Sequence, residues 1–137
     1  LVIPAERMKG GREKGVSMLR HEHSIPLSTQ AIKTLQDIPR LSDTYIFPGR
    51  RSNAVISDTA VRSVLKQLEY PDTTLHGFRS TFVDWAAENT DYKERLARIA
   101  IAHYDNSSSH SAYERTKLVQ KRIPLMQDWA DFCYSKC

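Results

Sequence analysis

The spacing of apolar and polar positions predicts a mainly α-helical chain with a small antiparallel β-sheet at one edge. Residues 1–8 and 21–27 are short stretches with β-branched residues and a proline near the end of each, a pattern typical of strands. Between them, glycines at positions 10, 11 and 15 favour turn conformations. The start of the chain is therefore predicted to be a β-hairpin closed by a long, flexible and basic loop over residues 9–20.

Five helices are predicted from apolar residues that recur every three or four positions. Ser28 supplies the cap of the first, over residues 28–38, and its apolar stripe consists of Ala31, Ile32 and Leu35. Residues 39–57 are expected to be mostly loop, because two prolines and a glycine interrupt them. Ser57 caps the second helix, and Pro71 ends that region. The residues expected on its buried side are Ala60, Val61, Val64, Leu65 and Leu68.

The third and fourth helices are predicted to begin near Thr74 and Asp91, and a polar connection over residues 103–111 separates them from a final amphipathic helix. The apolar positions of these three helices are Leu75, Phe78, Phe82 and Trp85 or Ala86 in the third, Tyr92, Leu96, Ile99 and Ala100 in the fourth, and Leu125, Met126, Trp129, Phe132 and Cys133 in the last. Since no repeat interrupts this pattern, a single domain is expected.

Composition narrows the class of protein only slightly. A length of 137 residues allows one domain with a core, but not comfortably two. The net charge of +4 mildly favours a polyanionic partner. Cys133 and Cys137 lack the further ligands of a zinc site and are expected to be thiols in a reducing cytoplasm. No apolar run reaches the length of a membrane span, and no signal peptide is visible.

The first candidate for chemistry is the pair His76 and Arg79, three residues apart on a predicted helix, so that both side chains point to the same side. A guanidinium grips two phosphate oxygens at once, while an imidazole donates to a third oxygen or handles a proton. A structural role fits the same residues, with Arg79 paired to Asp84 or Glu88 and His76 capping the helix start.

Further histidines and one tyrosine each allow an ordinary structural role. His103 ends the fourth helix, where the helix dipole favours a capping imidazole. Tyr113 precedes a basic stretch, but it is one of six tyrosines. His21 and His23 alternate on a predicted strand and could face the same way as metal ligands, although such a pair without a third ligand is more often a surface feature.

The ordered set of motifs is more specific than its members. "HGFR", then "IAHYDN", then "SAYER" resembles the C-terminal catalytic domain of the tyrosine recombinases, the phage-integrase family, and more closely its prophage and genomic-island integrase branch. The ten-residue step from His103 to Tyr113 fits that branch. The stretches "IPAERMK", "IPLSTQAI" and "RIPLMQDWADF" also resemble it, so the resemblance covers nearly the whole chain.

The resemblance implies a role for each matching residue. Tyr113 matches the nucleophile that attacks a DNA phosphodiester and forms a 3′-phosphotyrosine. Arg79 matches the second of two phosphate-gripping arginines, and His76 and His103 match the histidines that bond the phosphate and assist proton movement. Lys9 matches the hairpin lysine that protonates the leaving 5′ oxygen.

Other residues take supporting roles in this interpretation. Lys14 replaces Lys9 as the acid if the register of the hairpin loop slips, and otherwise contacts DNA together with Arg115 and Lys117. Asp105 is expected to orient the imidazole of His103. No metal or small-molecule cofactor is expected, because the acidic residues are scattered and form no cluster of the kind that magnesium nucleases use.

The match departs from the family at its first catalytic arginine, which lies before the hairpin and has no counterpart here, since Arg7 and Arg12 stand in the wrong element. Residues 1–137 are therefore expected to be part of a recombinase catalytic domain, truncated at its N-terminus, that folds but is catalytically impaired by itself.

The function implied by the resemblance is integration or excision of a prophage or genomic island. Its partners would be double-stranded DNA attachment sites and further copies of the protein in the bacterial cytoplasm, with no membrane. Two alternatives remain: an inactive module that binds the DNA backbone, and a type IB topoisomerase-like enzyme that relaxes DNA.

Overall fold

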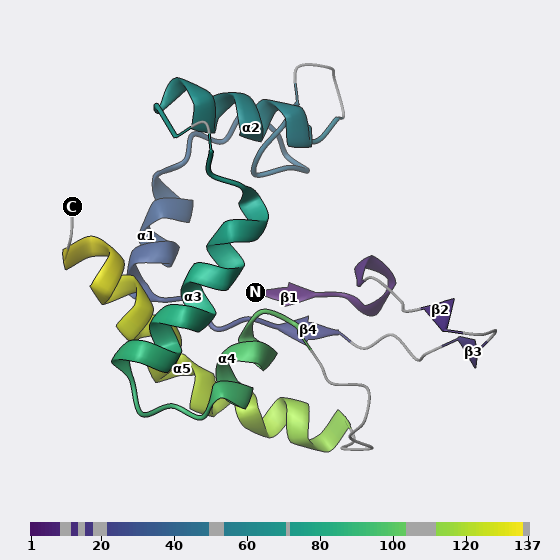
Figure 1. Cartoon of the computed structure of the whole chain (residues 1–137). Helices are drawn as coiled ribbons and strands as arrows, with labels where there is room; N and C mark the ends of the chain where they lie inside the picture. The colour runs from purple at the N-terminus through teal and green to yellow at the C-terminus, as the bar shows by residue number, and fades with distance from the viewer. Residues whose placement is uncertain are drawn as a thin grey trace.

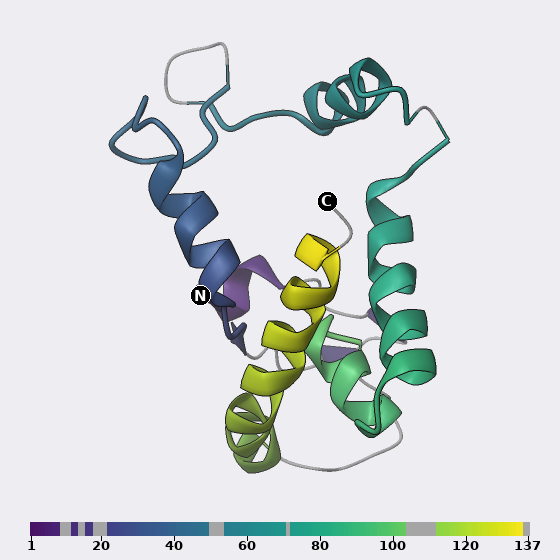
Figure 2. The ribbon, with the colours of Figure 1, turned by 90° about the vertical axis from the view of Figure 1, so that its left-hand side faces the viewer.

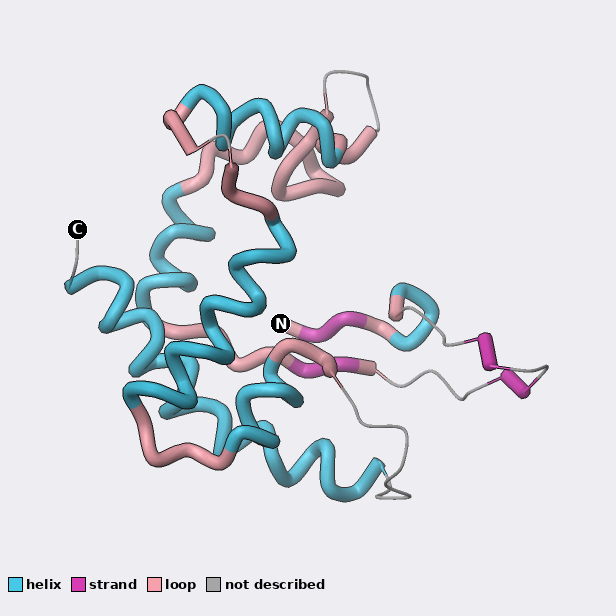
Figure 3. Tube along the Cα trace, viewed as in Figure 1, coloured by secondary structure: helices cyan, strands magenta, loops and turns pink. Residues whose placement is uncertain are grey.

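The computed structural model of this chain describes residues 1–8, 12–13, 16–17, 22–49, 54–70, 72–103 and 112–135, with backbone alone at 12–13, 16–17 and 112–117. These residues form five α-helices and two small antiparallel sheets (Figures 1 and 3), which confirms the predicted mainly helical class. The elements are β1 (Val2–Ile3), a 3-10 turn (Ala5–Arg7), β2 (Arg12–Glu13), β3 (Val16–Ser17), β4 (His23–Ser24), α1 (Thr29–Asp37), α2 (Asp58–Gln67), α3 (Leu75–Asn89), α4 (Glu94–Ala100) and α5 (Ala112–Ser135).

The predicted hairpin is present, and its base is the pairing of β1 with β4, in which Ile3 lies opposite His23. Two bonds extend the pairing, since the backbone nitrogen of Leu1 donates to the Ile25 carbonyl at 3.0 Å and the Ile25 N–H donates to the Leu1 carbonyl at 2.7 Å. The expectation of an unstructured loop over residues 9–20 is wrong in part, because β2 pairs with β3. In this pairing Arg12 is opposite Ser17 and Glu13 is opposite Val16.

Three predicted helix starts are confirmed by hydrogen bonds at their caps. The side-chain oxygens of Ser28, Ser57 and Thr74 each accept the backbone N–H three residues later, at 3.2, 3.2 and 2.9 Å. Such a bond satisfies one of the N–H groups that the first turn of a helix leaves without a partner. The fourth helix begins slightly later than expected, at Glu94, with Lys93 as its cap residue and no side-chain capping bond.

The core lies where α3, α4 and α5 pack against one another (Figure 2). Its buried side chains are Phe82, Trp85, Ala86, Leu96, Ala97, Ala100 and Leu125. Trp129 packs against this cluster and meets Phe82 edge to face, with ring centroids 5.6 Å apart. These three helices therefore provide the rigid part of the fold.

Helix α1 is attached to α5 mainly through amide groups. The Gln127 side chain accepts a hydrogen bond from the Thr29 backbone at 3.0 Å and donates one to the Gln30 side chain at 2.8 Å. These contacts hold the start of α1, which directly follows β4, against the core.

The predicted buried side of α2 is wrong. No residue of α2 is buried, and Val64 and Leu68 are 48% and 59% exposed. Leu75 and Phe78, at the start of α3, are also exposed rather than inward. The physical reason is position: α2 and the first turns of α3 lie beyond the packed part of α3, α4 and α5, so none of the described helices covers this apolar face (Figure 1).

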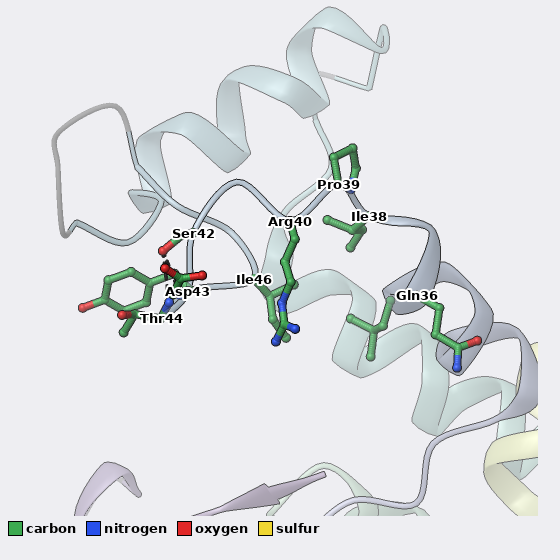
Figure 4. Close-up of a pocket in the computed structure, with 10 residues that line it drawn as sticks. Gln36, Ile38, Pro39, Arg40, Ser42, Asp43, Thr44 and Ile46 are labelled. Carbon is green, nitrogen blue, oxygen red and sulfur yellow. Dashed lines mark hydrogen bonds between the residues drawn. The ribbon is translucent and has the colours of Figure 1, made fainter.

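A hollow of about 580 Å³ lies between the end of α1 and the chain that follows it. Figure 4 shows Gln36, Ile38, Arg40 and Ile46 around it. None of the candidate catalytic residues lines this hollow, so it is not the candidate active site.

Candidate active site

Arg79 lies in the second turn of α3, and its guanidinium reaches the end of α4. Its Nη2 donates a hydrogen bond to the backbone carbonyl of Ile101. The expected alternative, an ion pair with Asp84 or Glu88, is not the contact that holds this side chain. A guanidinium carries five N–H donors in a rigid fork, so one bond to a carbonyl orients the group and leaves donors for an anion.

The end of α4 is closed by a left-handed residue. Ala102 has φ 56°, and its backbone N–H donates to Ile99 O at 3.0 Å while that of His103 donates to Arg98 O at 2.9 Å. This bond pattern is the Schellman motif, in which a residue with positive φ turns the chain off the helix axis. The turn fixes the backbone of His103 next to the Ile101 carbonyl that Arg79 binds.

The His103 side chain is exposed, with Nδ1 3.5 Å from Nη1 of Arg98. Arginine can only donate, so Nδ1 is the acceptor in this contact. Arg98 is itself held by Glu94, with Nη2 and Nε 2.7 and 2.9 Å from the same carboxylate oxygen. His103 lies two residues after Ile101, whose carbonyl anchors the Arg79 guanidinium.

His23 is buried at the same helix end, although sequence reasoning placed it as a surface residue or, with His21, a metal ligand. It is 3% exposed, and its Nε2 lies 3.2 Å from the carbonyl oxygen of Ala100. A nitrogen facing a carbonyl must carry a hydrogen, so Nε2 donates. The expectation of a surface position is therefore wrong for His23, and position 21, the other member of the suggested metal-ligand pair, lies outside the described residues.

Burial lowers the pKa of His23 below its usual value. The hydrogen bond to Ala100 acts in the opposite direction, and the positive charges of Arg122 and Arg79 lower the pKa further. His23 is accordingly neutral near pH 7, between guanidiniums that reach it from α5 and α3.

Arg122 belongs to the basic stretch that follows Tyr113, but its burial was not expected from the sequence. It is 2% exposed, and its Nε lies 3.4 Å from the carbonyl of Leu118. The sequence did contain a signal for this burial, because Leu118, Arg122 and Leu125 follow the four- and three-residue spacing of one helix face. That spacing puts Arg122 on the apolar face of α5, where a charge contributes to the local field more strongly than in water.

The remaining predicted site residues divide into two groups. His76 is the second residue of α3 and is exposed; the cap of that helix is Thr74, so the expectation that His76 caps it is wrong. Tyr113 lies in the first turn of α5, and Arg115 and Lys117 lie in the turn after it, all three described by backbone alone. Three further residues that were predicted to belong to the site lie outside the described residues: Lys9, Lys14 and Asp105.

Within the described ranges, no three or more His, Cys, Asp or Glu side chains gather in a way that would hold a metal ion. None of the helices in those ranges has the length and apolar character needed to cross a membrane.

Comparisons with known proteins agree with the sequence motifs. The chain is 31% identical over 134 residues to the prophage integrase IntZ of Escherichia coli K12, covering 96% of this chain and 31% of that protein. It is 30% identical over 141 residues to the integrase of Shigella phage Sf6, covering 99% and 34%. With the integrase of Enterobacteria phage P4 it is 31% identical over 142 residues, covering 95% and 32%. No protein-family model and no solved structure matches the chain. It spans about a third of the length of these relatives.

Proposed function

Because this chain is homologous to phage and prophage integrases over nearly its whole length, we propose that it is part of the catalytic domain of a tyrosine recombinase. The proposed activity is site-specific recombination of double-stranded DNA, by which a prophage or genomic island is integrated or excised. The observation that carries this proposal is the convergence of Arg79 and His103 at the end of α4, with Tyr113 in the first turn of the next helix.

In the proposed reaction, the Tyr113 phenol attacks the phosphorus of a DNA phosphodiester. A bond forms between the tyrosine oxygen and phosphorus, and the bond from phosphorus to the 5′ oxygen breaks. The phenol proton passes to a neighbouring acceptor such as an imidazole, and the 5′ oxygen receives a proton from Lys9. Since a phenol has a pKa of about 10 in water, it needs both the acceptor and local positive charge to react near pH 7.

Arg79 is proposed to bind the phosphate that carries the developing negative charge. Its anchoring to Ile101 holds the guanidinium before the DNA arrives, and a group oriented in advance stabilises a transition state without reorganising. His103 and His76 are proposed to donate to the same phosphate. The phosphotyrosine keeps the energy of the broken strand, so a second 5′ hydroxyl can rejoin it without ATP, metal or cofactor.

The activity is proposed for the parent protein, acting as a multimer on its DNA sites in the bacterial cytoplasm. The experiment uses that full-length parent with a nicked suicide substrate that contains its attachment site. We expect a protein–DNA adduct that survives denaturation in the unchanged protein and disappears in Tyr113→Phe. Tyr134→Phe is the matched control, because it removes a hydroxyl from the same helix, and it should leave the adduct.

Each contrary result has a distinct meaning. Site binding without any adduct would refute the recombinase and favour an inactive module that grips DNA phosphates. An adduct that persists in Tyr113→Phe would refute Tyr113 as the nucleophile. Relaxation of a plasmid without paired attachment sites would favour the topoisomerase-like alternative, and recombination by a protein that stays monomeric on DNA would refute the multimer.

A further inference from the structure

Three segments that are far apart in sequence meet at the last carbonyls of α4. His23 of β4 bonds the Ala100 carbonyl, and Arg79 of α3 bonds the next carbonyl, that of Ile101. His103 follows within the same turn. The β4, α3 and α4 segments therefore share one anchoring point made of two adjacent backbone oxygens.

His23 is the part of this arrangement that belongs to the hairpin. Its strand pairs with β1, and the backbone bonds between Leu1 and Ile25 hold the base of the hairpin in register. The buried bond from His23 to Ala100 ties this small sheet directly to the end of α4.

We propose that His23 is a positioning residue, which locks the base of the hairpin to the end of α4 and so fixes the hairpin relative to Arg79 and His103. This inference rests on the proposed function, in which the hairpin carries the acid Lys9 and the helix end carries the phosphate-binding groups. The two must be held in one geometry, since a displacement of about 1 Å can cost about a hundredfold in rate.

The surroundings of His23 explain why a neutral donor suits this position. Guanidiniums of Arg79 and Arg122 approach it from two helices, and the acceptor is an uncharged carbonyl. A cationic side chain would repel both arginines, and an apolar one would leave the Ala100 carbonyl buried without this donor. A neutral N–H placed where Nε2 stands meets both conditions.

The test compares three variants of the full-length parent on the nicked suicide substrate. In His23→Gln the amide nitrogen can take the place of Nε2, whereas His23→Asn carries the same group on a shorter side chain that falls short of Ala100. His23→Leu fills the space without a donor. For each we would measure the rate of adduct formation at saturating DNA, the Kd for the site, and the melting temperature.

We expect His23→Gln to form adduct within about threefold of the unchanged protein, and His23→Asn and His23→Leu to be slower by about ten- to a hundredfold. The Kd should change less than threefold in all three, because His23 touches no DNA in the proposed arrangement. The Gln and Asn pair decides the question even if the Leu variant fails to fold, since both are polar and differ only in reach.

Equal rates in Gln and Asn would overturn the positioning role, as would a loss of rate that follows the loss of DNA binding. An unchanged protein that forms no adduct would instead refute the proposed function. The result for the unchanged protein therefore separates a failure of the proposed function from a failure of the positioning role.

Discussion

The left-handed turn at Ala102 allows a prediction whose sign is opposite to the usual effect of glycine. We expect Ala102→Gly to stabilise the chain. An L-residue with a side chain pays about 1–2 kcal/mol to adopt a left-handed conformation, and Ala102 has φ 56°. Glycine avoids this cost, but its greater freedom in the unfolded chain lowers the free energy of unfolding by about 0.4–1 kcal/mol. The free energy of unfolding should therefore rise by about 0.5–1 kcal/mol.

The expected change in melting temperature follows from chain length. Unfolding entropy is roughly 2.1 cal/mol/K per residue, so for 137 residues the gain corresponds to a rise of about 2–4 °C. The assay is thermal unfolding of the 137-residue chain followed by circular dichroism. The Schellman bonds from residues 102 and 103 use backbone atoms and are kept in the variant.

The control is Ala87→Gly, at an exposed position inside α3, where glycine costs about 1 kcal/mol relative to alanine. This variant should melt lower by about 3 °C, given the same unfolding entropy. If Ala102→Gly also melts lower, the turn does not carry the strain assigned to it, and the account of how His103 is placed would be refuted.

Two further predictions concern the core and the buried histidine. Leu125→Ala removes a side chain that is 0% exposed and should lower the free energy of unfolding by about 2–5 kcal/mol in urea titration, whereas Leu41→Ala, at a position 77% exposed, should change it little. The pKa of His23 is lowered in the folded chain. As the pH falls through about 6.5, the unfolded chain therefore takes up the histidine proton before the folded chain does. The free energy of unfolding decreases on acidification below that pH. His23→Gln should therefore show a smaller drop in melting temperature between pH 7.5 and pH 5 than the unchanged chain, and an equal drop would contradict the assignment of His23 as a buried neutral group.

The features that were predicted from sequence are those that depend on neighbouring residues. The caps at Ser28 and Ser57, and the helix start near Thr74, were predicted because a capping bond spans only three residues. The buried positions Phe82, Leu96 and Leu125 were predicted because each lies on the apolar face of a helix that has another helix across it.

The wrong predictions concern which distant part of the fold packs against a given residue. The pattern of α2 identifies its apolar face, but whether Val64 and Leu68 are covered depends on distant parts of the fold. His23 was misplaced for the same reason, since its partner is 77 residues away and is a backbone oxygen that no side-chain pattern reveals. The bond from Arg79 to Ile101 could not be predicted either, because the carboxylates of Asp84 and Glu88 are nearer in sequence.

The use of main-chain oxygens at residues 100 and 101 has a consequence for how this region tolerates mutation. Every amino acid supplies the same carbonyl, so the acceptors for His23 and Arg79 survive any replacement that leaves the backbone path intact. Size still matters at Ala100, which is buried, whereas Ile101 is only partly covered. These two positions can therefore take other residues that fit the space and keep the same geometry, while loss of the N–H donor at position 23 or 79 breaks it. Deep mutational scanning of positions 23, 79, 100 and 101 should show this asymmetry, with more substitutions tolerated at the acceptor positions 100 and 101 than at the donor positions 23 and 79.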